Sequence, residues 1–135
     1  MKDYRGYSWA VTLPDGWRGR PDPECDTFEA QEDIGALQIS SYRKDEPVMD
    51  ADLEDFASEH IKSGAKLKRV ACGSFTGIYL TYGTDDEYWR HWYLRYGSTM
   101  LYVTYVCPQA RRGEEDPAVS AILDSLHVVE PPERS

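Results

Sequence analysis

The sequence predicts an α+β domain in which an antiparallel sheet of about six to seven strands carries helices on its faces, an α/β/α sandwich. Three observations predict this class. Phe75–Cys107 holds ten of the seventeen aromatic residues and is typical of three strands joined by tight turns. Two other segments place apolar residues at helical spacing. The strand that begins at Thr99 is apolar on both faces, so we expect both faces of the sheet to be covered.

The strands are predicted from alternation of side chains and from Gly, Pro and Asp at the breaks. In Tyr7–Leu13, for example, every second residue is large and apolar, and Pro14-Asp15-Gly16 then turns the chain. Trp17 is expected to fold over the sheet edge, and Arg18–Glu24 to be a surface loop. The expected strands are Tyr7–Leu13, Asp26–Glu32, Ala36–Tyr42, Leu67–Cys72, Phe75–Tyr82, Glu87–Arg95 and Thr99–Val106.

Two helices are predicted. The first begins at Asp50 or Asp52, ends near Lys62, and carries an apolar stripe. That stripe consists of Leu53, Phe56, Ala57, His60 and Ile61. The second begins at Asp116-Pro117, where a capping residue precedes a proline at the first helical position.

These elements give the order β-β-β-α-β-β-β-β-α. At 135 residues, we expect residues 1–130 to form one domain and residues 131–135, which include two prolines, to form a flexible C-terminal tail. No run of about 18 apolar residues occurs, so no membrane-inserted helix is expected.

Two segments resemble the PsbP-like superfamily, which includes photosystem extrinsic subunits, Ran-binding import factors and DcrB-like bacterial proteins. Trp9-Ala10-Val11-Thr12-Leu13-Pro14-Asp15-Gly16-Trp17 is similar to the opening strand, proline turn and tryptophan of that family. Ala121-Ile122-Leu123-Asp124-Ser125-Leu126-His127-Val128 is similar to its closing helix. The resemblance implies a binding subunit or adaptor rather than an enzyme. It transfers no functional residue, because the matching positions belong to the core and turns.

Charge is unevenly distributed along the chain. The net charge is −9, yet Asp22–Glu59 holds thirteen acidic and two basic residues, a net of −11, and the remainder is +2. An acidic chain is unsuited to nucleic acid, so no nucleic-acid partner is expected. A solvated, solubilising face explains this segment, and so does a surface that attracts a basic protein. The candidate contact residues are Asp52, Asp55, Glu59, Glu29 and Glu32.

A second candidate site lies on one face of the strand Glu87–Arg95. Trp89, His91, Tyr93 and Arg95 alternate along it and would form an aromatic, cationic strip. Such a strip could hold an anionic or aromatic ligand if that face is open. If a helix covers it, the same residues are ordinary sheet packing.

No catalytic or cofactor motif is visible, and we expect neither a cofactor nor a metal. The histidines His60, His91 and His127 have no metal-ligand spacing. Cys25, Cys72 and Cys107 form no CxxC pair and are expected to be reduced thiols.

We therefore expect a non-enzymatic, bacterial-type protein-binding module, similar in role to an immunity protein, a chaperone or an adaptor. The alternative is a small-ligand carrier that uses the aromatic sheet face. The N-terminus has no apolar signal region, so we expect a cytoplasmic protein. The alternative is a processed mature protein from which a signal peptide has been removed.

Overall fold

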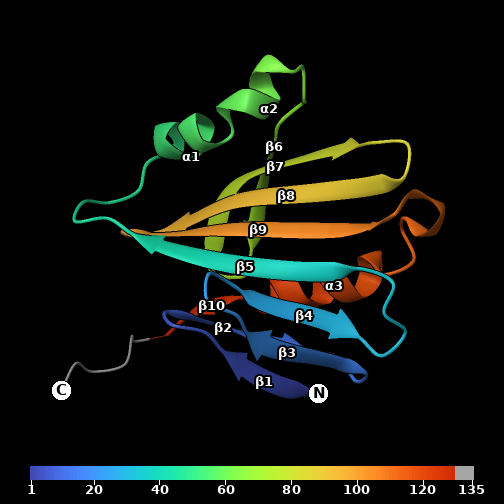
Figure 1. The fold of residues 1–135 in the computed structure, drawn as a ribbon. Coiled ribbons are helices and arrows are strands. Elements are labelled where there is room, and N and C mark those ends of the chain that lie inside the picture. The colour runs from blue at the N-terminus through green and yellow to red at the C-terminus, as the bar shows by residue number, and fades with distance from the viewer. Residues whose placement is uncertain (130–135) are drawn as a thin grey trace.

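The computed structural model describes residues 1–129 and confirms the α+β class. Its main sheet has seven antiparallel strands in the order β3-β4-β5-β9-β8-β7-β6 (Figure 1). In chain order these strands are β3 (Trp17–Pro21), β4 (Asp26–Ala30), β5 (Ala36–Arg43), β6 (Lys68–Cys72), β7 (Phe75–Gly83), β8 (Glu87–Tyr96) and β9 (Thr99–Pro108).

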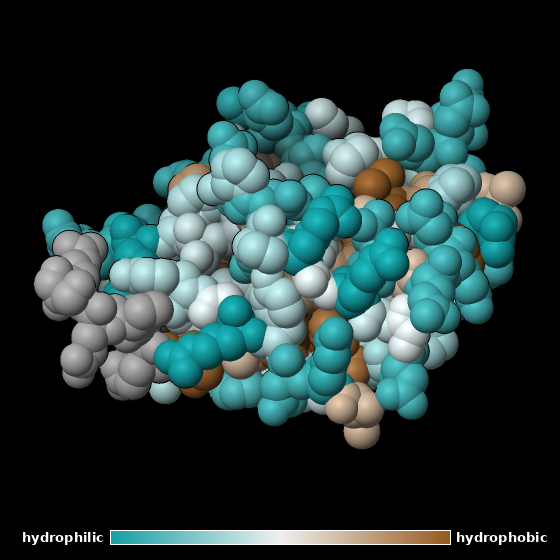
Figure 2. All heavy atoms as spheres, turned by 60° about the horizontal axis from the view of Figure 1, so that its bottom comes forward, coloured by the Kyte–Doolittle hydropathy of each residue, from teal (hydrophilic) through white to brown (hydrophobic). Residues whose placement is uncertain are grey.

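A second sheet of three strands lies beside the main sheet, below it in Figure 1. Its central strand is β2 (Trp9–Leu13), which pairs with β1 (Lys2–Arg5) and with the short β10 (His127–Val128). The two ends of the described chain therefore meet in one small sheet. Seen from this side, the surface is mostly hydrophilic, with small separate apolar spots (Figure 2).

The helices lie on opposite faces of the main sheet, as predicted for a sandwich. On one face, α1 (Asp50–Phe56) and α2 (Ser58–Lys62) lie over β7 and β8. On the other, α3 (Asp116–Asp124) packs beside β2 (Figure 1). A short 3-10 helix, Gln109–Arg111, precedes α3. In the described residues, no helix is long and apolar enough to span a membrane.

The centre of the fold is the pair β8 and β9, which belongs to the aromatic segment Phe75–Cys107 predicted to form three strands. They pair over their full lengths, with Trp92 opposite Val103 and Leu94 opposite Leu101. Gly97 has a φ of +57°, which glycine adopts without strain and which closes the turn between these strands. Large side chains alternate to both faces, so each face builds its own core.

The larger core lies between the main sheet and the layer of β2 and α3. It contains residues such as Trp9, Phe28, Leu94, Tyr105 and Ile122, all almost fully buried. The smaller core lies under α1 and is built from Val48, Leu53, Ala57, Ile78, Leu80, Tyr93 and Met100. Tyr82 and Tyr102 pack against this smaller core and are only partly buried, so the cover that α1 and α2 provide is incomplete there.

Three local predictions differ from the structure. Trp17 begins strand β3, and Arg18–Pro21 continue it, because their pairing with β4 supplies backbone hydrogen bonds that a loop would lack. Strand β2 is in the second sheet, where it is buried on both faces. The predicted helix from Asp50 to Lys62 is two helices, because Ala57 has φ −88° and ψ 3° and interrupts it. The predicted tail, residues 131–135, lies outside the described residues.

Gly73, in the turn between β6 and β7, has a left-handed backbone, and we expect its substitution to reduce stability more than that of the other glycines with positive φ. Gly73 and Gly97 have nearly equal φ values, +58° and +57°. A Cβ at Gly73 would lie 1.8 Å from the carbonyl oxygen of Leu126, whereas one at Gly97 would meet nothing within 4 Å. We expect Gly97→Ala to cost about 1 kcal/mol of unfolding free energy and Gly73→Ala about 2 kcal/mol more, because a backbone must move. Urea denaturation of both variants measures this difference, and equal losses would contradict it.

Candidate functional site

The five predicted acidic contact residues do not form one patch. Glu29 lies on β4 at the end of the sheet where Ala36 opens β5, and Glu32 lies in the following turn. Asp52, Asp55 and Glu59 lie on α1 and α2. Asp50, the first residue of α1, accepts a hydrogen bond from Arg95. Arg95 and Tyr42 both pair with Met100 of β9, so α1 begins near the Tyr42 end of β5. Ala36 and Tyr42, near the two ends of β5, are about 20 Å apart along the strand. The structure thus separates the set into two groups.

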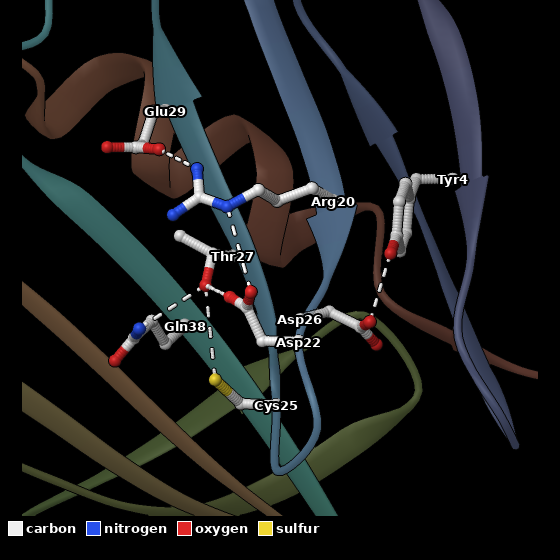
Figure 3. A network of polar contacts seen from close by, with 8 residues as sticks. All are labelled: Tyr4, Arg20, Asp22, Cys25, Asp26, Thr27, Glu29 and Gln38. Atoms are coloured by element: carbon white, nitrogen blue, oxygen red, sulfur yellow. Dashed lines mark hydrogen bonds and ion pairs between the residues drawn. The ribbon is translucent and has the colours of Figure 1, made fainter.

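Glu29 belongs to a polar network on β3, β4 and β5 (Figure 3). Its carboxylate accepts a hydrogen bond from Arg20, whose guanidinium also lies 3.7 Å from Asp22. Thr27 donates to Asp22 over 2.5 Å and accepts a bond of 3.3 Å from Gln38. These bonds hold the hairpin between β3 and β4, and Arg20 places one positive charge beside the carboxylates of Asp22 and Glu29.

On the opposite side of the same hairpin, Tyr4 donates a hydrogen bond of 3.0 Å to Asp26. Burial, followed by this bond and the nearby carboxylates, raises the pKa of Tyr4 to about 12. Burial also raises the pKa of Asp26. This contact joins β1 of the small sheet to β4 of the main sheet, as the two side chains in Figure 3 show.

Asp52 has a structural task at the start of α1. Its carboxylate accepts hydrogen bonds from the backbone N–H of Met49, at 2.8 Å, and from Lys44, at 3.0 Å. These bonds lower the pKa of Asp52. Asp55 and Glu59 are exposed, and within residues 1–129 neither forms an ion pair. The exposed acidic charge on this side is therefore carried by α1 beyond its first turn and by α2.

The predicted strip on β8 does share one face, but its centre is covered. His91 and Tyr93 are 3% and 4% exposed, whereas Trp89 and Arg95 at the two ends are partly exposed. Arg95 donates a hydrogen bond of 2.8 Å to Asp50 at the start of α1. Arg95 is thus engaged by the protein itself, and the strip is a floor beneath the helices rather than an open surface.

His91 is surrounded by aromatic rings. Its ring centroid lies 5.0 Å from those of His60 and Tyr82, and its Nδ1 lies 3.2 Å from the hydroxyl of Tyr102. Its Nε2 is buried and has no hydrogen-bond partner in the structure. Burial, followed by repulsion from His60, lowers the pKa of His91 to about 4. This imidazole is therefore neutral at pH 7, consistent with packing among tyrosines.

A pocket of about 270 Å³ opens beside this cluster, between the helices and the sheet. Its walls come from β5, α1, α2, β8 and β9. The lining residues are Tyr42, Phe56, Glu59, His60, Tyr93, Met100 and Tyr102. Tyr42 and Phe56 form the outer rim and are 49% and 59% exposed. The pocket thus brings together one residue from each predicted site, Glu59 and Tyr93.

Sequence reasoning missed most of this pocket. The helical spacing predicts that Phe56 is buried, but α1 faces the core through Leu53 and Ala57 and leaves Phe56 exposed. The sequence pattern indicates only that Tyr42 and Tyr102 lie on strands. The signal that could have found them is alternation, which places Tyr42, Tyr102 and Tyr93 on the same face of three neighbouring strands.

The two buried cysteines have weakly acidic thiols. Burial raises the pKa of Cys72 to about 11 and also raises the pKa of Cys107. Cys25 is partly exposed and lies 3.9 Å from the hydroxyl of Thr27. In the part of the chain that the structure describes, no three His, Cys, Asp or Glu side chains are grouped so that they could hold a metal ion.

Solved structures share this architecture. A protein from Bacteroides thetaiotaomicron VPI-5482 matches with a TM-score of 0.74 and 15% identity, over 99% of this chain and 50% of that one. LpqN of Mycobacterium tuberculosis, involved in cell envelope biogenesis, matches with a TM-score of 0.62 and 14% identity, over 92% of this chain and 83% of that one. Cyanobacterial PsbP (CyanoP) from Synechocystis sp. PCC 6803 matches with a TM-score of 0.61 and 14% identity, over 95% of this chain and 92% of that one.

These matches show that the chain has a PsbP-like fold, as the resemblance in its first strand and last helix implied. The chain spans half the length of the Bacteroides protein. Neither a scan of protein-family models nor a search of curated proteins found a match.

The buried His91 should make stability depend on pH. An unfolded histidine has a pKa of about 6.5, whereas that of His91 in the folded protein is about 4. Between these values the unfolded chain binds a proton that the folded protein does not, so acid destabilises the fold. The contribution of neutral His91 to the free energy of unfolding is fully retained above pH 6.5 and is lost as the pH falls towards 4.

We expect this contribution to fall by about 2 kcal/mol between pH 7.5 and pH 5. His91→Phe should remove that share of the pH dependence, and His127→Phe, at an exposed position, should keep it. Urea denaturation of wild type and both variants at the two pH values measures this. A His91→Phe protein that lost as much stability as wild type would contradict the prediction.

Proposed function

We propose that this protein is a non-enzymatic protein-binding module, and that the exposed side of α1 and α2 contacts a basic partner. The observation that carries the proposal is the combination of acidic and apolar residues there. Four of the eight large apolar side chains exposed in the described residues lie on or beside this helix pair. They are Tyr42, Met49, Phe56 and Ile61. Glu54, Asp55 and Glu59 are exposed among them.

Exposed apolar side chains that are gathered together, with charged residues between them, are typical of protein interaction sites. The acidic residues would accelerate the encounter with a basic partner, and the apolar residues would hold it. The resemblance to PsbP-like proteins, which implies a binding subunit or adaptor, supports the same class of role. The raised thiol pKa values of Cys72 and Cys107 count against either of them as a nucleophile.

The alternative is a small-ligand carrier that uses the face of Trp89, His91, Tyr93 and Arg95. The adjoining pocket favours it, but about 270 Å³ is smaller than the roughly 300–1,000 Å³ of sites for drug-sized ligands. Native mass spectrometry of the purified protein tests this alternative. A bound small molecule that is lost in a Tyr93→Ala variant would support the carrier, and a bare protein would count against it.

Charge reversal on α1 tests the protein-binding proposal. We expect Glu54→Lys/Asp55→Lys to weaken capture of a basic partner about tenfold at low salt, because two attractive contacts become repulsive. Asp85→Lys/Asp86→Lys makes the same change in net charge at an exposed turn away from the helices and should bind like wild type. Asp52 is left unchanged because it caps α1.

The measurement is an affinity capture from lysate of the source organism, with wild type and both variants immobilised and washed in rising salt. Mass spectrometry identifies the retained proteins. A basic protein that wild type and the Asp85/Asp86 variant retain, and that the Glu54/Asp55 variant loses, supports the proposal. If wild type retains no basic protein, or both variants retain it equally, the proposed surface is wrong.

A further inference from the structure

The pocket beside α2 is walled by aromatic rings from both sides. Tyr42 of β5 and Phe56 of α1 stack at the mouth, with centroids 6.3 Å apart and planes inclined by 26°. Tyr93 of β8 and Tyr102 of β9 stack at the base, 5.1 Å apart and inclined by 27°. An aromatic ring carries partial negative charge on its faces, so such a pocket favours a positively charged group.

The pocket lining includes one carboxylate, Glu59, whose negative charge also favours a positively charged group. Glu59 of α2 is exposed at this pocket, and no ion pair engages it within the described range 1–129. The ion pairs of this helix pair in the described residues involve Asp50 and Asp52, both in the first turn of α1. Burial raises the pKa of Tyr102, so its phenol remains neutral at pH 7. A carboxylate over neutral aromatic rings is suited to a cation with an apolar stem.

The size of the pocket limits what can enter it. At about 270 Å³ it lies below the range of drug-sized ligand sites. The two aromatic side chains of the rim are exposed to solvent, Phe56 to 59% and Tyr42 to 49%. One side chain from another protein would fit within this volume, and the chain that carries it would cover the exposed rim.

We propose that this pocket receives one cationic side chain, a lysine or an arginine, from the basic partner. The inference rests on the proposed function and adds the recognition element to it. The aliphatic stem would pack against the rings of Phe56 and Tyr42 at the mouth, and the charged end would lie beside Tyr93, Tyr102 and Glu59. The acidic helices would attract many basic proteins, and the pocket would select those that present a protruding cation.

The test uses two short peptides on the full chain. One is acetyl-Gly-Gly-Lys-Gly-Gly-amide, and the other carries norleucine in place of lysine, which keeps the stem and removes the charge. Titration of isotope-labelled protein, followed by NMR, should move the side-chain signals of Phe56, Tyr93 and Tyr102 with the lysine peptide. We expect the norleucine peptide to bind at least about threefold more weakly, the minimum for a partly exposed cation–π contact.

Two variants assign the binding to the pocket. Phe56→Ala and Glu59→Gln should each weaken the lysine peptide about threefold or more, and both change exposed residues whose loss leaves the cores intact. Tyr7→Ala and Glu24→Gln are matched controls at exposed positions outside both the pocket lining and the proposed helix surface, and should bind like wild type. Equal binding of the lysine and norleucine peptides, or equal effects of pocket and control variants, would overturn the inference.

These outcomes are separable from those of the charge-reversal experiment. If Glu54→Lys/Asp55→Lys loses a basic protein but the two peptides bind alike, the acidic surface stands and the pocket assignment fails. If the lysine peptide is preferred and lost in Phe56→Ala, but no basic protein is captured from lysate, the pocket binds cations and the proposed protein-binding function fails.

Discussion

The structure depends on one constraint, which is that β8 and β9 carry large side chains on both faces. A sheet of this kind is stable only when both faces are kept from water, since burial of apolar area is the main favourable contribution to folding. The small sheet and α3 cover one face around Leu94 and Leu101. The helices α1 and α2 cover the other around Tyr93 and Met100. The order of the remaining elements follows from this requirement.

The two covers are unequal, and the candidate site arises from that inequality. The small sheet and α3 span much of one face, whereas α1 and α2 together are twelve residues long and end over the middle of the other. Beside the junction of α1 and α2, the rings of Tyr93 and Tyr102 line a pocket. The helices contact the core through Leu53 and Ala57, and Phe56 between them remains exposed at the pocket rim. Incomplete cover therefore leaves aromatic surface available to a partner.

Much of the fold follows from local sequence patterns, and the part that does not depends on distant pairing. Strands β7, β8 and β9 are predicted within one or two residues, since alternation and turn residues mark them in the sequence itself. Strand β3 is missed because Arg18, Arg20 and Pro21 are typical of a loop, and only the partner strand β4 makes them extended. Strand β1 is missed for the same reason, because its residues are polar and its order comes from β2.

The exposed charge of the candidate site also depends on residues that are distant in the sequence. Sequence counts charge along a segment, but whether a carboxylate faces solvent depends on which cations the fold brings to it. Asp22 and Glu29 meet Arg20, Asp50 meets Arg69 and Arg95, and Asp52 meets Lys44. Arg69 and Arg95 lie outside the acidic segment Asp22–Glu59, so part of its net charge of −11 is balanced by residues that its sequence does not contain. What remains exposed on α1 and α2 lies beside the aromatic pocket, and for that reason charge and aromatic surface belong to one hypothesis there rather than to two.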